Sequence, residues 1–114
     1  MDVDQGAGCV ALSEVASCLD PDHAGFFSFP TFNSMQSTCC QRLYHGDDSM
    51  VVRAPTGAGK TVLFELAIFR MLRHRGSPNA SPPHVRVAKV LYLAPLKALC
   101  DEKAQEWSQK FGRL

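Results

Sequence analysis

A loop in the middle of the chain has the residue types and spacing that bind phosphate. Residues 54–61 read Ala-Pro-Thr-Gly-Ala-Gly-Lys-Thr, which is the pattern G-x-x-x-x-G-K-[ST] with alanine in place of the first glycine. Gly57 and Gly59 let backbone N–H groups curl around an anion without a Cβ in the way. Lys60 would reach the outer phosphates of a nucleotide, and the Thr61 hydroxyl would take a place on Mg²⁺. The pattern therefore predicts a nucleotide site in which Lys60 and Thr61 do the chemistry.

The sequence on either side of the loop supports this interpretation against the alternative, an ordinary glycine-rich turn before a helix. Residues 49–54 are a short β-rich run that predicts a buried strand. Residues 60–74 lack Gly and Pro and predict a helix that is apolar nearly all round, and hence buried against a sheet. A strand, this loop and a helix in that order are the setting that the motif requires. We therefore assign nucleotide binding to Ala54, Pro55, Thr56, Gly57, Ala58, Gly59, Lys60 and Thr61.

The elements around this unit predict an α/β fold with a parallel sheet and flanking helices. Upstream, Asn33 or Ser34 can cap a helix that runs to about His45. Downstream, a proline-rich surface loop over residues 75–84 leads into a second predicted strand, Val85–Leu93, and then an amphipathic helix over residues 96–111. Alternation of strands and helices is typical of parallel sheets.

The first residues of the chain give a weaker signal. Residues 1–25 mix small and acidic residues without clear periodicity. We expect a poorly ordered leader there, with a short helix near Ala11–Leu19, and a folded domain over residues 26–114.

Composition narrows the class of protein. The formal net charge is +1, so contact with nucleic acid must come from a local patch or from backbone amides. The five cysteines form no C-x-x-C pair, which predicts reduced thiols in an intracellular protein, and the four histidines lack metal-ligand spacing, so we assign no zinc. No apolar run approaches the roughly 18 residues that span a bilayer, and no secretory signal is evident.

Three motifs together resemble those of the superfamily 2 helicases, and most of all the Ski-type and meiotic crossover helicases. They are Phe-Asn-Ser-Met-Gln-Ser at residues 32–37, the loop at residues 54–61 with its continuation Val-Leu-Phe-Glu-Leu-Ala-Ile, and Ala-Pro-Leu-Lys-Ala-Leu-Cys at residues 94–100. The resemblance covers about residues 26–114. It implies a RecA-like P-loop domain, ATP and Mg²⁺ as cofactors, 3′ to 5′ movement on DNA, and a nuclear role in meiotic recombination.

The same resemblance implies roles for residues outside the loop. Gln36 would contact the adenine edge, because an amide offers both a donor and an acceptor, and either Phe29 or Phe32 would stack on the base. Pro95 and Lys97 would lie beside a phosphate of the bound strand. For Gln36 and Lys97 the alternative is a solvated residue on a helix surface, and for the phenylalanines it is a place in the core.

Part of the expected machinery does not occur in the sequence. Hydrolysis needs a carboxylate box such as Asp-Glu-x-His, and Asp101-Glu102 is followed by Lys103-Ala104 on a predicted helix. We interpret the chain as about half of a first motor domain, and expect it alone to fold poorly, bind ATP weakly and not unwind DNA. The alternatives are an RNA helicase of the spliceosomal or exosome-linked type, or a nucleotide-binding fragment without turnover.

Overall fold

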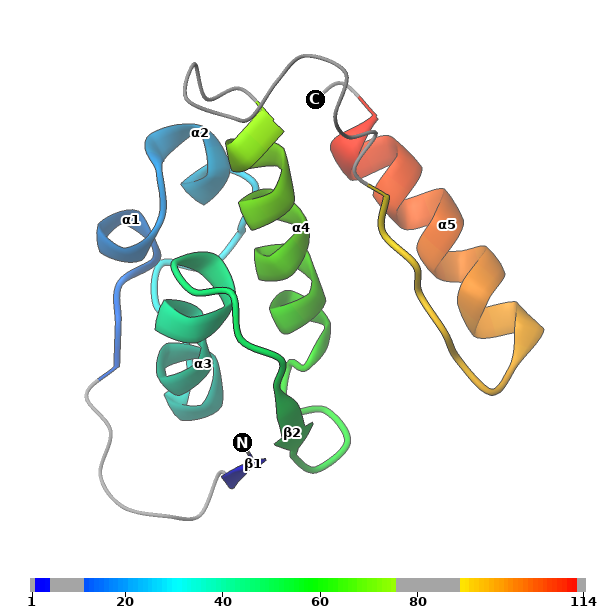
Figure 1. Ribbon diagram of the computed structural model, residues 1–114, viewed down its shortest axis with the longest axis horizontal. Coiled ribbons are helices and arrows are strands. Elements are labelled where there is room, and N and C mark those ends of the chain that lie inside the picture. Colours follow the sequence, from blue (N-terminus) through cyan, green and yellow to red (C-terminus); the bar gives the residue numbers. More distant parts are fainter. Residues whose placement is uncertain (1, 5–11, 76–88, 113–114) are drawn as a thin grey trace. The chain divides into compact units, whose positions relative to one another are not determined.

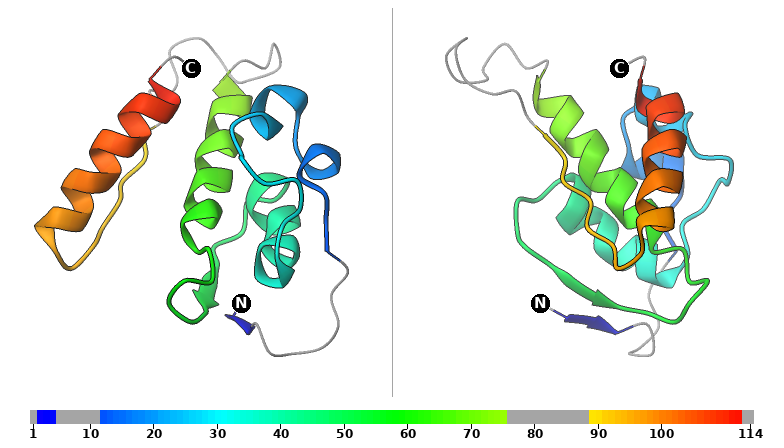
Figure 2. Two further views of the ribbon diagram at one scale, coloured as in Figure 1. Left: turned by 180° about the vertical axis from the view of Figure 1, so that it is seen from behind. Right: turned by 90° about the vertical axis from the view of Figure 1, so that its right-hand side faces the viewer.

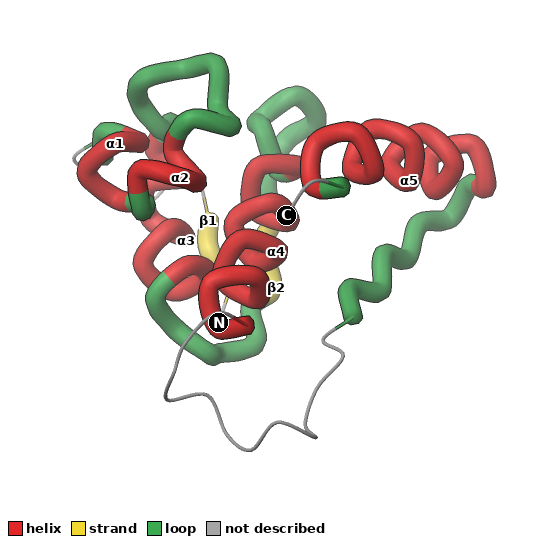
Figure 3. Tube along the Cα trace, turned by 90° about the horizontal axis from the view of Figure 1, so that it is seen from above, coloured by secondary structure: helices red, strands yellow, loops and turns green. Residues whose placement is uncertain are grey.

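The computed structural model describes residues 2–4, 12–75 and 89–112, which belong to two units, Met1–His74 and Arg75–Leu114. Figures 1 and 3 show the elements of each. They are β1 (Asp2–Asp4), α1 (Val15–Cys18), α2 (Pro21–Ala24), α3 (Ser34–Tyr44), β2 (Val51–Arg53), α4 (Thr61–Arg75) and α5 (Lys97–Phe111). The predicted helices after residue 33, after the loop and after residue 96 are all confirmed.

The two strands pair in parallel, with Val3 opposite Val52. β2 lies within the predicted strand at residues 49–54, but the prediction that this strand is buried is wrong, because the side chain of Val51 is 58% exposed. β1 was not predicted, because aspartate is depleted in strands and the run Asp-Val-Asp therefore has low β-propensity. Within the described ranges the sheet has these two strands, so a larger parallel sheet stays a prediction.

The second predicted strand, Val85–Leu93, does not form where the structure can be described. Residues 85–88 lie outside the described residues, and residues 89–93 carry no regular secondary structure. Leu91 and Leu93 are exposed. A β-rich run becomes a strand only when a neighbour supplies backbone hydrogen-bond partners, and no described residue pairs with this run.

The core of the first unit is built between α3, α4 and an aromatic segment that precedes α3. Phe69 of α4 is fully buried, and its ring lies 4.7 Å from that of His23, 5.3 Å from Phe26 and 5.8 Å from Phe27. Figures 1 and 2 show α4 alongside α3 and α2. The expectation that α4 buries itself against a sheet is therefore wrong in the described residues: helices and aromatic rings cover its apolar face, and Phe64 is half exposed.

The expectation of a poorly ordered leader over residues 1–25 is also wrong for residues 12–25. Val15 and Leu19, at either end of α1, are buried. Backbone hydrogen bonds from Val15 N–H to Pro30 C=O, 2.9 Å, and from Phe32 N–H to Ser13 C=O, 2.9 Å, tie this segment to the residues before α3. α1 lies within the short helix that was expected near Ala11–Leu19. Two apolar residues four positions apart are too brief a signal to predict that this helix packs on the residues before α3.

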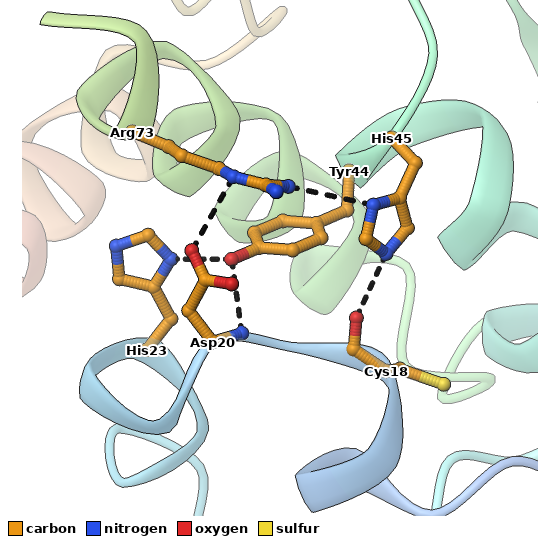
Figure 4. Close-up of polar contacts among 6 residues, drawn as sticks. All are labelled: Cys18, Asp20, His23, Tyr44, His45 and Arg73. Carbon is orange, nitrogen blue, oxygen red and sulfur yellow. Dashed lines mark hydrogen bonds and ion pairs between the residues drawn. The ribbon is translucent and has the colours of Figure 1, made fainter. Parts of the chain in front are cut away.

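A polar network joins the α1–α2 segment to the C-terminal ends of α3 and α4 (Figure 4). The Tyr44 hydroxyl accepts from the Asp20 N–H at 3.1 Å and lies 2.8 Å from Nδ1 of His23. The Arg73 guanidinium pairs with the Asp20 carboxylate at 3.3 Å and lies over the Tyr44 ring. Since the Tyr44 side chain has no exposed surface, these partners replace the water that its hydroxyl would otherwise bind.

The buried thiols of α3 make the first unit sensitive to alkaline pH. Burial raises the pKa of Cys39, and burial together with the adjacent Cys18 thiol raises the pKa of Cys40 to about 12. In the unfolded chain these thiols ionise near 9.0. The folded state therefore holds their protons more tightly, and this contribution to stability is full below pH 9.0 and is lost as the pH rises towards 12.

We therefore expect the urea midpoint of the chain to fall steadily above about pH 9, and to fall less steeply in Cys40→Ala. The residual slope in the variant comes from Cys39 and from Tyr44, whose pKa burial also raises. Urea unfolding followed by far-ultraviolet circular dichroism at several pH values measures both slopes. Equal slopes in the two proteins would contradict the prediction.

Where the structure describes the second unit, the helix α5 follows residues 89–96, which carry no regular secondary structure. The ring of Trp107 on α5 lies 5.2 Å from the ring of Tyr92, edge to face, and the Lys103 ammonium lies 5.7 Å from the Trp107 ring centre. Lys103 also pairs with Glu106 at 2.9 Å. These contacts fix residues near Tyr92 to the C-terminal half of α5.

Candidate phosphate-binding site

The loop that the sequence assigns to phosphate lies between the end of β2 at Arg53 and the start of α4 at Thr61. Gly57 and Gly59 have φ values of 84° and 82°, in the region that side chains with a Cβ rarely adopt. A hydrogen bond from the Ala58 N–H to the Pro55 C=O, 3.2 Å, closes the turn. The strand, the glycine loop and the helix thus follow one another as the motif requires.

Lys60 and Thr61 lie where the loop becomes the helix. The Lys60 ammonium donates to the Ala54 carbonyl at 3.0 Å, so it lies back across the loop to which it belongs. α4 has no acidic side chain in its first turn, and Thr61 is its first residue. The positive end of the helix dipole is therefore not neutralised from within the first turn, which favours an anion there.

Gln36 is only 5% exposed and lies against the loop. Its Oε1 accepts from the Asn33 N–H at 3.0 Å, and its Nε2 donates to the Gly59 carbonyl at 3.1 Å. A primary amide has two N–H groups and two acceptor lone pairs, so one donor and one acceptor are left for another partner. Contact with an adenine edge stays a prediction. The contact with Gly59 was not anticipated.

Asn33 is a residue of the site that was not predicted to belong to it. It was expected only as one of two candidate caps, and the structure selects it over Ser34. Its Oδ1 accepts from the Gln36 N–H at 2.9 Å, and its Nδ2 donates to the Ala58 carbonyl at 2.7 Å. The Asn-x-x-Gln spacing of a capping box was the available signal for the first contact. Nothing in the sequence indicated the second.

The two phenylalanines that were candidates for stacking on the base, Phe29 and Phe32, differ in burial. Phe32 has no exposed surface and packs edge to face on Phe27 and Phe29. A ring enclosed in this way has no free face for a base, so Phe32 belongs to the core. Phe29 is partly exposed, and its role stays a prediction.

Pro95 and Lys97 lie in the second unit, at the start of α5. The Lys97 ammonium pairs with the Asp101 carboxylate one turn along the helix at 2.7 Å, and its side chain is 87% exposed. A pair this exposed is easily exchanged for another anion, because solvent screens most of its attraction. The assignment of these residues to nucleic acid stays a prediction.

Two negative findings apply to residues 2–4, 12–75 and 89–112. No group of three or more His, Cys, Asp or Glu side chains in these ranges could hold a metal ion. No helix in the same ranges is long and apolar enough to cross a membrane.

Comparison with known proteins adds a family to this geometry. Residues 33–114 match the model of the DEAD/DEAH box helicases. Over 87 residues the chain is 49% identical to the ATP-dependent DNA helicase homolog MER3 of Arabidopsis thaliana, which covers 75% of this chain and 8% of that protein. It is 44% identical over 105 residues to the ATP-dependent DNA helicase MER3 homolog of Oryza sativa subsp. japonica, covering 91% and 9%.

A third relative is also named as an ATP-dependent DNA helicase. The chain is 39% identical over 90 residues to the ATP-dependent DNA helicase MER3 of Saccharomyces cerevisiae, covering 79% of this chain and 7% of that protein. The chain thus spans less than a tenth of the length of these relatives. The matched region includes Asn33, Gln36, the glycine loop and α5.

Proposed function

Because this chain belongs to the DEAD/DEAH box helicase family, we propose that it carries the ATP-binding loop of an ATP-dependent DNA helicase. Family membership gives it a RecA-like α/β fold, and β2, α3, α4 and α5 lie within the matched residues. The observation that carries the proposal is the loop between β2 and α4, in which two glycines have positive φ directly before Lys60 and Thr61. DNA is the favoured nucleic acid because the relatives described above are named DNA helicases.

Each residue of the site has a role in this proposal. The loop amides and the N-terminal turn of α4 bind the phosphates, and Lys60 exchanges the Ala54 carbonyl for a phosphate oxygen. Gln36 uses its free donor and acceptor on adenine. Pro95 and Lys97 lie along the DNA backbone and supply position without reading sequence.

The residues of the loop fit a magnesium ion. Mg²⁺ prefers oxygen ligands and is usually held by few protein groups together with substrate phosphates and water. The Thr61 hydroxyl, at the first position of α4, is an oxygen of this kind. Bound Mg²⁺ would offset the charge of the outer phosphates.

The wider activity rests on the resemblance of the three motifs to those of the meiotic crossover helicases. We propose 3′ to 5′ movement along DNA and a place in meiotic recombination in the nucleus. An RNA helicase shares the same physics of single-strand binding, since base stacking and backbone charge hardly distinguish the two acids. Strand separation measured in parallel on DNA and RNA duplexes distinguishes them, and preference for RNA would overturn the DNA assignment.

We expect Lys60→Ala to lower the affinity for Mg²⁺-ATP at least tenfold, because a hydrogen bond from a charged donor contributes roughly 1.5–3 kcal/mol. Titration of the 114-residue chain with a fluorescent ATP analogue and Mg²⁺ measures the change. Lys103→Ala is the matched control, since Lys103 contacts Glu106 and Trp107 in the second unit. Equal affinity for the ATP analogue in Lys60→Ala and Lys103→Ala would contradict the proposed site.

A further inference from the structure

We propose that Asn33 is a positioning residue for the phosphate loop: its side-chain amide holds the Ala58 carbonyl and thereby turns the Gly59 N–H towards the bound phosphate. The proposal rests on the proposed function, since it concerns how the same loop is shaped. It starts from two hydrogen bonds that link α3 to the loop. Asn33 Nδ2 donates to Ala58 O at 2.7 Å, and Gln36 Nε2 donates to Gly59 O at 3.1 Å.

Because of the geometry of the peptide bond, these contacts fix the direction in which the N–H groups of the loop point. The C=O of one residue and the N–H of the next belong to a single planar group and point in opposite directions when the bond is trans. The described residues contain no cis peptide bond. When α3 holds the Ala58 carbonyl, the Gly59 N–H must point away from α3. When Gln36 holds the Gly59 carbonyl, the Lys60 N–H must likewise point away from α3.

Two neighbouring N–H groups on one face of a loop form a concave anion site. Left to itself, a loop with two glycines at positive φ has many alternative conformations, and fixing one of them costs free energy when the ligand arrives. Because Asn33 and Gln36 already hold the loop in one conformation, less free energy is needed to order it when the nucleotide binds. Asn33 therefore acts on the nucleotide through the loop.

The structure separates this role of Asn33 from its role in helix α3. Oδ1 accepts from the Gln36 N–H at 2.9 Å and caps the helix, while Nδ2 alone contacts Ala58. Serine is about as good a cap as asparagine, but it has no amide that could reach Ala58. Aspartate also caps and has nearly the shape of asparagine, but an ionised carboxylate cannot donate to a carbonyl.

The test compares Asn33→Ser, Asn33→Asp and Asn33→Ala in the 114-residue chain, with Mg²⁺ and a fluorescent ATP analogue as the probe. Melting followed by circular dichroism is measured on the same samples. We expect Asn33→Ser to melt within a few degrees of wild type and to bind the analogue about threefold to tenfold more weakly, the loss that one neutral hydrogen bond predicts. Asn33→Ala should bind as weakly and also melt lower, because it removes the cap.

Asn33→Asp supplies a readout that a purely structural role would not change. Its affinity, divided by that of wild type at the same pH, should rise as the pH falls through the carboxyl pKa, because the protonated acid regains a donor for Ala58. Unchanged affinity in Asn33→Ser would overturn the inference while the proposed function stands. A melting loss in Asn33→Ser as large as that in Asn33→Ala would make the role structural and overturn it too. A wild-type chain that does not bind Mg²⁺-ATP would overturn the proposed function, and the inference with it.

Discussion

Gly59→Ala should destabilise the first unit by about 2–4 kcal/mol and remove measurable nucleotide binding, whereas Gly57→Ala should cost only about 1–2 kcal/mol. The two glycines have nearly the same φ, 82° and 84°, so the penalty for a side chain at positive φ is common to both. They differ in their surroundings. A Cβ on Gly59 would lie 2.5 Å from Gln36 Nε2 and 3.5 Å from Asn33 Nδ2, whereas a Cβ on Gly57 would meet nothing within 4 Å.

The larger effect at Gly59 arises because the Gln36 amide cannot stay where it is. Its hydrogen bond to the Gly59 carbonyl would break, and a buried amide that loses its partner costs roughly 1–3 kcal/mol. Urea unfolding by circular dichroism gives the two free energies, and titration with the fluorescent ATP analogue gives the binding. If the two alanine variants prove equally stable, the close approach of Gln36 to Gly59 is not what fixes the loop.

Phe69→Ala should cost about 3–5 kcal/mol, which is a large part of the whole stability of a small domain. The Phe69 ring has no exposed surface, and its loss would leave a cavity facing His23, Phe26 and Phe27. Those residues come from α2 and the segment after it, so the cavity would also loosen the packing of that segment on α4.

Phe64→Ala, on the same helix, is the matched control for this substitution. Its ring is 49% exposed, so truncation removes less buried surface, and we expect a cost of about 1 kcal/mol or less. Both substitutions replace Phe by Ala within α4, so their effects on helix propensity are alike. The two variants therefore differ in how much of the lost ring was buried. Both are measured by urea unfolding, and a Phe69→Ala variant no less stable than Phe64→Ala would contradict the core described above.

The sequence predicts the helices of this chain better than their contacts. The lack of Gly and Pro over residues 60–74 and the cap at Asn33 predict α4 and α3 to within a residue or two, because both signals are local. The contact between Asn33 and Ala58 spans 25 positions and depends on how α3 packs beside the loop. No local pattern encodes it.

Other differences have the same origin. The alternative for Gln36, a solvated residue on a helix surface, is wrong, because tertiary packing leaves the residue 5% exposed and brings its amide within 3.1 Å of the Gly59 carbonyl. Val85–Leu93 has the composition of a strand, but composition alone supplies no neighbouring strand. α2 was not predicted, because its four residues are too few for a hydrophobic period to be recognised.

The contact between Trp107 and Tyr92 has a practical consequence for optical work on this protein. Trp107 is the single tryptophan of the chain, and it lies on α5 of the second unit, where its ring contacts Tyr92 and Lys103. Its fluorescence emission therefore reports on the surroundings of α5, whereas circular dichroism sums the helices of both units. A urea curve recorded by emission that differs from the dichroism curve would show the two units unfolding separately. A second fluorophore at Phe64→Trp, on the half-exposed face of α4 one turn after Lys60, would give the phosphate loop its own emission signal for rapid-mixing experiments.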